Sequence, residues 1–61
     1  MTIDEFKAQD RVELHPATDL WMRGARYGTV TTIGHKLLRI HIDATNRVIY
    51  MAPRNILRIV D

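Results

Sequence analysis

The chain contains no cysteine and no serine, and it has only two prolines and three glycines. The absence of cysteine excludes disulfides and thiolate metal sites, and without serine or cysteine the chain lacks the commonest catalytic nucleophiles. Its apolar runs are much shorter than the roughly 18 residues of a membrane-spanning helix. Met1–Glu5 is acidic and does not have the apolar core of a signal peptide. We therefore expect a soluble, cytoplasmic protein that does not bind membranes.

Length and charge narrow the possibilities further. Sixty-one residues form one domain, residues 1–61, and a chain this short buries only about 60% of its unfolded surface. Its stability is therefore marginal unless it oligomerises. The net charge is +2, and seven of the nine basic residues are arginine, whose planar guanidinium binds phosphate or carboxylate and stacks on aromatic rings. A charge of +2 is equally typical of an ordinary solvated surface.

An N-terminal helical segment is predicted over residues 1–9. Thr2 and Glu5 have the spacing of a capping box, which marks the start of a helix. This pattern predicts a short helix over residues 3–8, with Ile3 and Phe6 facing inward.

The next segment alternates in polarity and then becomes a long polar loop. In Arg11–His15 every second residue is apolar, which predicts a strand with its apolar side chains in the core. Within the loop, Thr18 and Asp19 are typical N-cap residues, and Gly24 suits the end of a helix. We expect a single helical turn over residues 20–22.

Four further segments rich in β-branched and aromatic residues predict strands: Tyr27–Ile33, Leu37–Ile42, Arg47–Met51 and Ile56–Val60. In the first of these, regular alternation would place Val30 and Ile33 on opposite faces of the strand. Placing both in the core therefore requires a bulge at Thr31 and Thr32. In the next two strands we place these residues inward: Leu38, Ile40, Ile42, Ile49 and Met51.

Turn-forming residues separate the strands at positions 34–35, 43–46 and 52–55. Together the elements predict a mainly β fold, a five-stranded SH3-like barrel with a short N-terminal helix and a 3₁₀ turn before the last strand. The alternative is a small open β-meander carrying an N-terminal helix.

The first loop and its flanking strands resemble those of a known barrel. Asp10–Leu14, followed by Gly24, Gly28 and Val30, resembles the KOW-type barrel of ribosomal and transcription-elongation proteins. This resemblance implies a barrel that contacts RNA or protein.

Other resemblances involve overlapping residues. Leu14–Pro16, Trp21, Gly28–Val30 and Arg54–Leu57 are similar to the small barrel subunit of photosystem I, which implies a docking role within a larger complex. Trp21, Gly28–Val30 and Val48–Tyr50 are similar to type II dihydrofolate reductases, which implies a tetramer that binds substrate in a central pore. The whole chain also resembles short proteins encoded in tailed-phage and bacterial genomes.

The first loop concentrates candidate binding residues: Trp21, Arg23, Arg26 and Tyr27. An exposed tryptophan beside two arginines is typical of single-stranded nucleic-acid binding, and it also suits the aromatic anchor of a protein interface. A loop tryptophan can instead plug an open end of a small barrel. Trp21 is therefore either a ligand contact or a lid on the core.

A second group of candidates lies on the predicted sheet: Arg39, His41 and Tyr50. Alternation places all three on the outer face of adjacent strands, together with Val48. Such a face is a basic-aromatic surface for nucleic acid, a plain solvated face, or an oligomer interface, because Val48 and Tyr50 are both apolar and outward.

The remaining motifs carry no chemistry that we can assign. His15, His35 and His41 lie in separate segments without the spacing of a metal site. Gly24 and Gly28 lack the lysine and hydroxyl residue of a phosphate-binding loop. We expect no metal site, no cofactor and no catalytic residue.

Three functional hypotheses follow. The leading one is a non-enzymatic small binding module that binds nucleic acid or an acidic protein surface through the arginine and aromatic residues of the loop and the sheet. The second is a structural or docking subunit that acts through homo-oligomerisation or a larger complex. The third is an enzyme, a tetramer like the type II dihydrofolate reductases.

Overall fold

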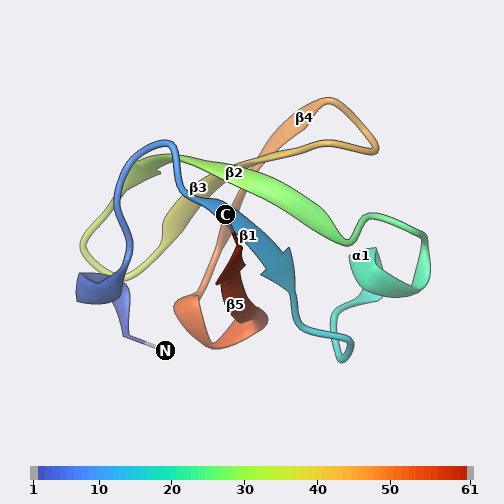
Figure 1. The fold of residues 1–61 in the computed structure, drawn as a ribbon, viewed down its shortest axis with the longest axis horizontal. Coiled ribbons are helices and arrows are strands. Elements are labelled where there is room, and N and C mark those ends of the chain that lie inside the picture. Colours follow the sequence, from blue (N-terminus) through green and yellow to red (C-terminus); the bar gives the residue numbers. More distant parts are fainter. Residues whose placement is uncertain (1, 61) are drawn as a thin grey trace.

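The computed structural model describes residues 2–60 as a mainly β protein. Its elements are η1 (Ile3–Glu5), β1 (Arg11–Leu14), α1 (Asp19–Met22), β2 (Tyr27–Ile33), β3 (Leu38–Ile42), β4 (Arg47–Met51), η2 (Pro53–Asn55) and β5 (Ile56–Val60) (Figure 1). The strands form one antiparallel sheet in the order β4-β3-β2-β1-β5. The predicted mainly β class and the five strands are confirmed.

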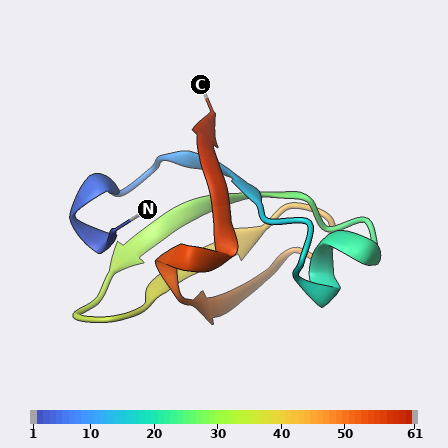
Figure 2. The same ribbon diagram turned by 90° about the horizontal axis from the view of Figure 1, so that it is seen from below.

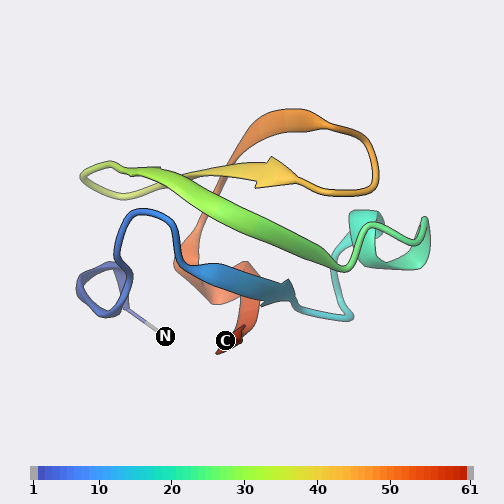
Figure 3. The same cartoon turned by 45° about the horizontal axis from the view of Figure 1, so that its top comes forward.

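The barrel closure that the sequence predicts is not shown. The 3₁₀ helix η2 separates β4 from β5, and β5 then pairs with β1 at the other end of the strand order. Over residues 2–60 no ladder joins β4 to β5, so the hydrogen bonding is that of an open sheet. The sheet is strongly twisted, and β5 runs across the direction of β2 and β3 (Figure 2). The short helices η1 and α1 lie at opposite ends of β1 and β2 (Figure 3).

The core lies on the inner face of this sheet and consists of ten buried apolar residues: Phe6, Val12, Leu14, Ala25, Val30, Leu38, Ile40, Ile42, Met51 and Ile56. No polar or charged residue among those described is buried. The predicted orientation of β4 is confirmed, because Met51 is buried and Ile49 is half-buried, whereas Val48 and Tyr50 are exposed.

The predicted helix over residues 3–8 is wrong in length. Only Ile3–Glu5 is helical, as one 3₁₀ turn. The Glu5 carboxylate accepts from the backbone N–H and the hydroxyl of Thr2, at 3.1 and 3.2 Å, which lowers the pKa of Glu5. Phe6 then leaves the helical conformation, with φ −98° and ψ 150°, and its side chain enters the core. Tertiary burial of this one ring ends the helix.

Two strand boundaries also differ from the prediction by one residue. His15 lies outside β1 because its N–H donates to the carbonyl of Asn55 at 2.8 Å instead of joining the sheet. Leu37 lies outside β3 because its carbonyl accepts from the N–H of Gly34 at 2.9 Å, which closes the turn before the strand.

The expected bulge in β2 is present. The prediction that it buries both Val30 and Ile33 is confirmed for Val30 and wrong for Ile33. The register between β2 and β3 shifts between Val30 and Thr32. Val30 is fully buried, as expected. Ile33, however, is 38% exposed, because it pairs with Leu38 at the very end of the ladder, where no further strand covers it.

The single turn of α1 is capped as the sequence predicts. The Thr18 hydroxyl oxygen accepts from the N–H of Trp21 at 3.2 Å. At the other end Gly24 has φ +90°, and the N–H of Ala25 donates to the carbonyl of Leu20 at 2.9 Å. These bonds are those of a Schellman motif, and they direct the buried Ala25 into the core.

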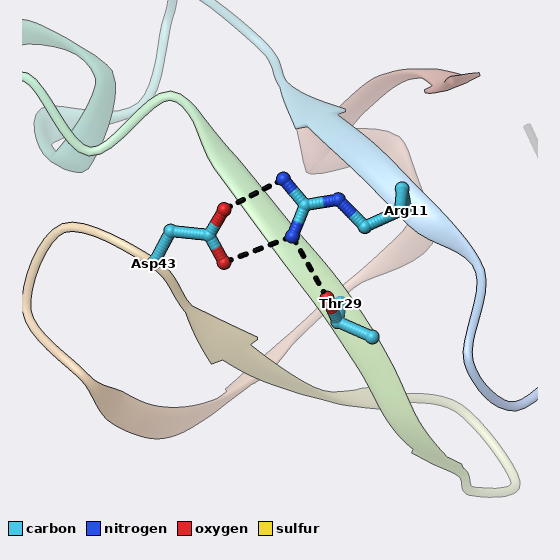
Figure 4. A network of polar contacts seen from close by, with 3 residues as sticks. All are labelled: Arg11, Thr29 and Asp43. Atoms are coloured by element: carbon cyan, nitrogen blue, oxygen red, sulfur yellow. Dashed lines mark hydrogen bonds and ion pairs between the residues drawn. The ribbon is translucent and has the colours of Figure 1, made fainter. Parts of the chain in front are cut away.

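An ion pair joins β1 to the turn after β3 across the outer face (Figure 4). The Arg11 guanidinium donates two hydrogen bonds to the Asp43 carboxylate, at 3.0 and 2.6 Å, and one to the Thr29 hydroxyl at 3.0 Å. These bonds hold the pKa of Asp43 below its ordinary value. Because the ion pair crosses β2, it holds three strands in register.

Replacing Asp43 by asparagine is expected to cost about 0.5–1 kcal/mol near neutral pH, since both side chains of the pair are more than 40% exposed and therefore screened by solvent. A carboxyl with a depressed pKa in the folded state stabilises the fold above its unfolded pKa and loses that contribution as the pH falls through the folded pKa. The stability difference between wild type and variant, measured by urea denaturation, should therefore disappear in acid. A difference that persists at acid pH would contradict this assignment.

Candidate functional site

The three predicted sheet residues share one exposed face. In the register between β3 and β4, Arg39 pairs with Tyr50 and His41 pairs with Val48. Tyr50 is 70% exposed, and Arg39 is also exposed. Since directly opposite residues on one face have Cβ atoms about 5 Å apart, Arg39 and Tyr50 form an adjacent cationic and aromatic pair.

Tyr27 connects this face to the first loop. Thr29 pairs with His41, and Tyr27 lies two residues earlier on β2, so its side chain points to the same outer face. It is 42% exposed and lies at the end of β2 that follows the α1 loop. The outer face therefore runs from the α1 loop past Tyr27 and His41 to the Arg39–Tyr50 pair.

Trp21 is placed as a partial lid on the core. Its side chain is half-buried and packs against the core cluster, and its indole Nε1 is buried without a hydrogen-bond partner among the described residues. The guanidinium carbon of Arg26 lies 4.1 Å from the ring centroid, which is cation–π geometry. Arg26 thus covers the ring, whereas Arg23, the C-cap residue of α1, is exposed.

The charges of the outer face leave it electropositive. Its two carboxylates are already paired, Asp43 with Arg11 and Glu13 with Arg58 at 2.8 Å. On this face Arg11, Arg39 and Arg58 stand against Asp43 and Glu13, an excess of one cation. Arg39 makes no ion pair with any residue that the structure describes, so its charge is free to act on a ligand.

One end of this face has a hollow that the sequence does not predict. It is lined by Gly34, His35, Lys36, Leu37 and Tyr50 and has a volume of about 360 Å³. The sequence predicts only a turn at residues 34–35. Nothing in the sequence between residues 34 and 50 indicates this proximity, which arises because the pairing of β3 with β4 brings Tyr50 beside the β2–β3 turn.

The histidine of the outer face, His41, is engaged within the β3–β4 hairpin. Among residues 2–60 no group of three or more histidine, cysteine, aspartate or glutamate side chains is placed to hold a metal ion. His41 Nε2 instead lies 2.7 Å from the side-chain oxygen of Asn46, as part of the hairpin.

Comparisons of the chain with protein-family models, with curated proteins and with solved structures give no significant match. In the described part of the chain, no helix is long and apolar enough to cross a membrane.

Proposed function

We propose that this chain is a non-enzymatic binding module that binds single-stranded nucleic acid on its outer sheet face. The observation that carries this proposal is the exposed pair of Arg39 and Tyr50 on neighbouring strands. An aromatic ring stacks on a base of any sequence, and an adjacent arginine binds the phosphate, which together are the elements of single-strand recognition.

We also propose that the fold is an SH3-like barrel of the KOW type. The strand order, with β5 paired to β1, the long first loop and the 3₁₀ helix before the last strand support this proposal. The KOW-like residues Asp10–Leu14, Gly24 and Gly28 favour the same assignment, and that resemblance implies contact with RNA or protein. The SH3-like fold alone does not determine function, so the proposal depends on the face itself.

The layout of the face suits an extended strand. A single-stranded nucleic acid that enters at the α1 loop, near Arg23 and Arg26, would first pass Tyr27 and His41. It would then reach Arg39 and Tyr50. Electrostatic attraction would bring the two molecules together, and stacking on the tyrosines would then hold the bases. Asp43 and Glu13 are each paired with an arginine, so these two carboxylates repel the phosphates along this path less than free carboxylates would.

The proposal is tested by fluorescence anisotropy with a labelled oligothymidylate of about ten nucleotides, a length within the usual site sizes for such proteins. If about three cations contact phosphates, the logarithm of the association constant should fall with the logarithm of salt concentration with a slope of about −2. Binding that does not change between about 50 and 200 mM salt would contradict the proposal.

A second candidate function is self-association through β4. This strand is at the end of the strand order, so one of its edges is free, and Val48 and Tyr50 expose apolar surface beside that edge. Exposed strand edges readily pair with other strands. Light scattering at micromolar concentration should then show a dimer or larger species, and a monomer would contradict this candidate.

A further inference from the structure

We propose that the hollow beside Tyr50 is a pocket for a single nucleobase. It is lined by the β2–β3 turn, residues 34–37, and by Tyr50 of β4. This inference rests on the proposed function, because it assigns the position at which the outer face holds a base.

The apolar walls of the pocket are the side chains of Leu37 and Tyr50. Leu37 is 45% exposed and Tyr50 is 70% exposed, so both offer unpaired apolar surface to a ligand. A volume of about 360 Å³ lies at the lower end of the roughly 300–1,000 Å³ of ligand pockets. A planar ring system has the size and the apolar faces that such a site requires.

The turn that forms one side of the pocket has a fixed shape. The N–H of Gly34 donates to the carbonyl of Leu37 at 2.9 Å. A Cβ atom at position 34 would lie 2.7 Å from that same carbonyl oxygen, which is too close for any side chain. Glycine is therefore required here, and the turn holds Leu37 in place before a ligand binds.

Charge complementarity identifies the occupant. The residues that line the pocket include Lys36 and no carboxylate, and Arg39 lies directly opposite Tyr50. A base has a flat apolar face for Tyr50 and Leu37, and it is attached to a phosphate that these cations can bind. A base within a duplex is stacked and cannot enter, so the pocket selects a single strand.

The test compares an oligothymidylate with an abasic oligonucleotide of the same length and charge. The wild-type protein should bind the oligothymidylate about tenfold more tightly, since one stacked base contributes on that scale. The variant Tyr50→Leu should lose most of this preference, with stacking on Tyr27 retaining the remainder, and should bind the abasic strand as the wild type does. Tyr50→Phe, which keeps the ring, should retain the preference.

A second pocket variant and a control variant outside the pocket distinguish loss of the pocket from loss of the fold. Leu37→Ala removes the other wall of the pocket and should also reduce the preference for the base-containing strand. Leu57→Ala removes an apolar side chain of similar exposure (43%) from β5, outside the pocket, and should leave the preference unchanged. Circular dichroism of each variant shows that the fold is intact.

The outcomes separate the two proposals. If Tyr50→Leu keeps the preference, the base pocket is wrong and the proposed function stands, because the bases then stack elsewhere on the face, such as on Tyr27. If the wild type binds both oligonucleotides equally, no base stacks on the face, and both the pocket and the proposed single-strand recognition are wrong. If the wild type binds neither oligonucleotide, both proposals are wrong. If polyglutamate displaces the oligothymidylate as effectively as unlabelled oligothymidylate does, the face recognises acidic protein surfaces and the pocket does not hold a base.

Discussion

Replacing Gly28 by valine is expected to lower the free energy of unfolding by about 3 kcal/mol, which is at the upper end of the usual cost of overpacking a core. This loss would remove most of the stability of the protein. A Cβ atom at position 28 would lie 2.7 Å from Cγ2 of Ile40 and 2.9 Å from the backbone carbonyl oxygen of His41. A side chain there forces β3 away from β2 and breaks their ladder. A domain of this size rarely has more than about 3–5 kcal/mol of stability from its core.

The sign of this effect is informative because local preference predicts the opposite. Valine has a much higher β-propensity than glycine, so without the close approach of β3 the substitution would stabilise the strand. Gly24→Ala is the matched control: no atom lies within 4 Å of the added Cβ, and the positive φ alone costs about 1–2 kcal/mol. Urea denaturation measures both. A midpoint for Gly28→Val equal to or above the wild type would show that the strands do not approach this closely.

Reversing the charge of Arg39 is expected to weaken binding of oligothymidylate by at least about tenfold, because a hydrogen bond to a charged group contributes roughly 1.5–3 kcal/mol and the new carboxylate repels phosphate. The slope of the salt dependence should fall in magnitude by about 0.7 for the lost contact. The measurement is fluorescence anisotropy of Arg39→Glu at several salt concentrations. The side chain is exposed, so the substitution should not unfold the protein.

Arg54→Glu is the matched control for this variant. It makes the same change in net charge, but Arg54 is an exposed residue of η2 and lies outside the outer sheet face. We expect Arg54→Glu to retain most of the affinity. Equal losses for the two variants would mean that binding follows the net charge of the protein, and that the face containing Arg39 and Tyr50 is not the site.

Much of the candidate site could be predicted because its sheet residues obey a local rule. Side chains alternate between the two faces of a strand, so the buried positions of β3, such as Ile40, place Arg39 and His41 on the opposite face. The same rule assigns Tyr50 to the outer face of β4. The environment of Trp21 could not be predicted in this way, because its contact with Arg26 depends on how the loop folds over the core.

The sequence by itself determined the strands, the bulge after Val30 and the capped turn from Thr18 to Gly24, because each depends on residues close together in the chain. Only the tertiary structure decided where distant segments meet. Burial of Phe6 ends the first helix early, and exposure of Ile33 follows from the end of a ladder. The hollow beside Tyr50 likewise exists only because strand pairing brings the β2–β3 turn to β4. Such contacts are selected by the packing of the whole core, which no local pattern encodes.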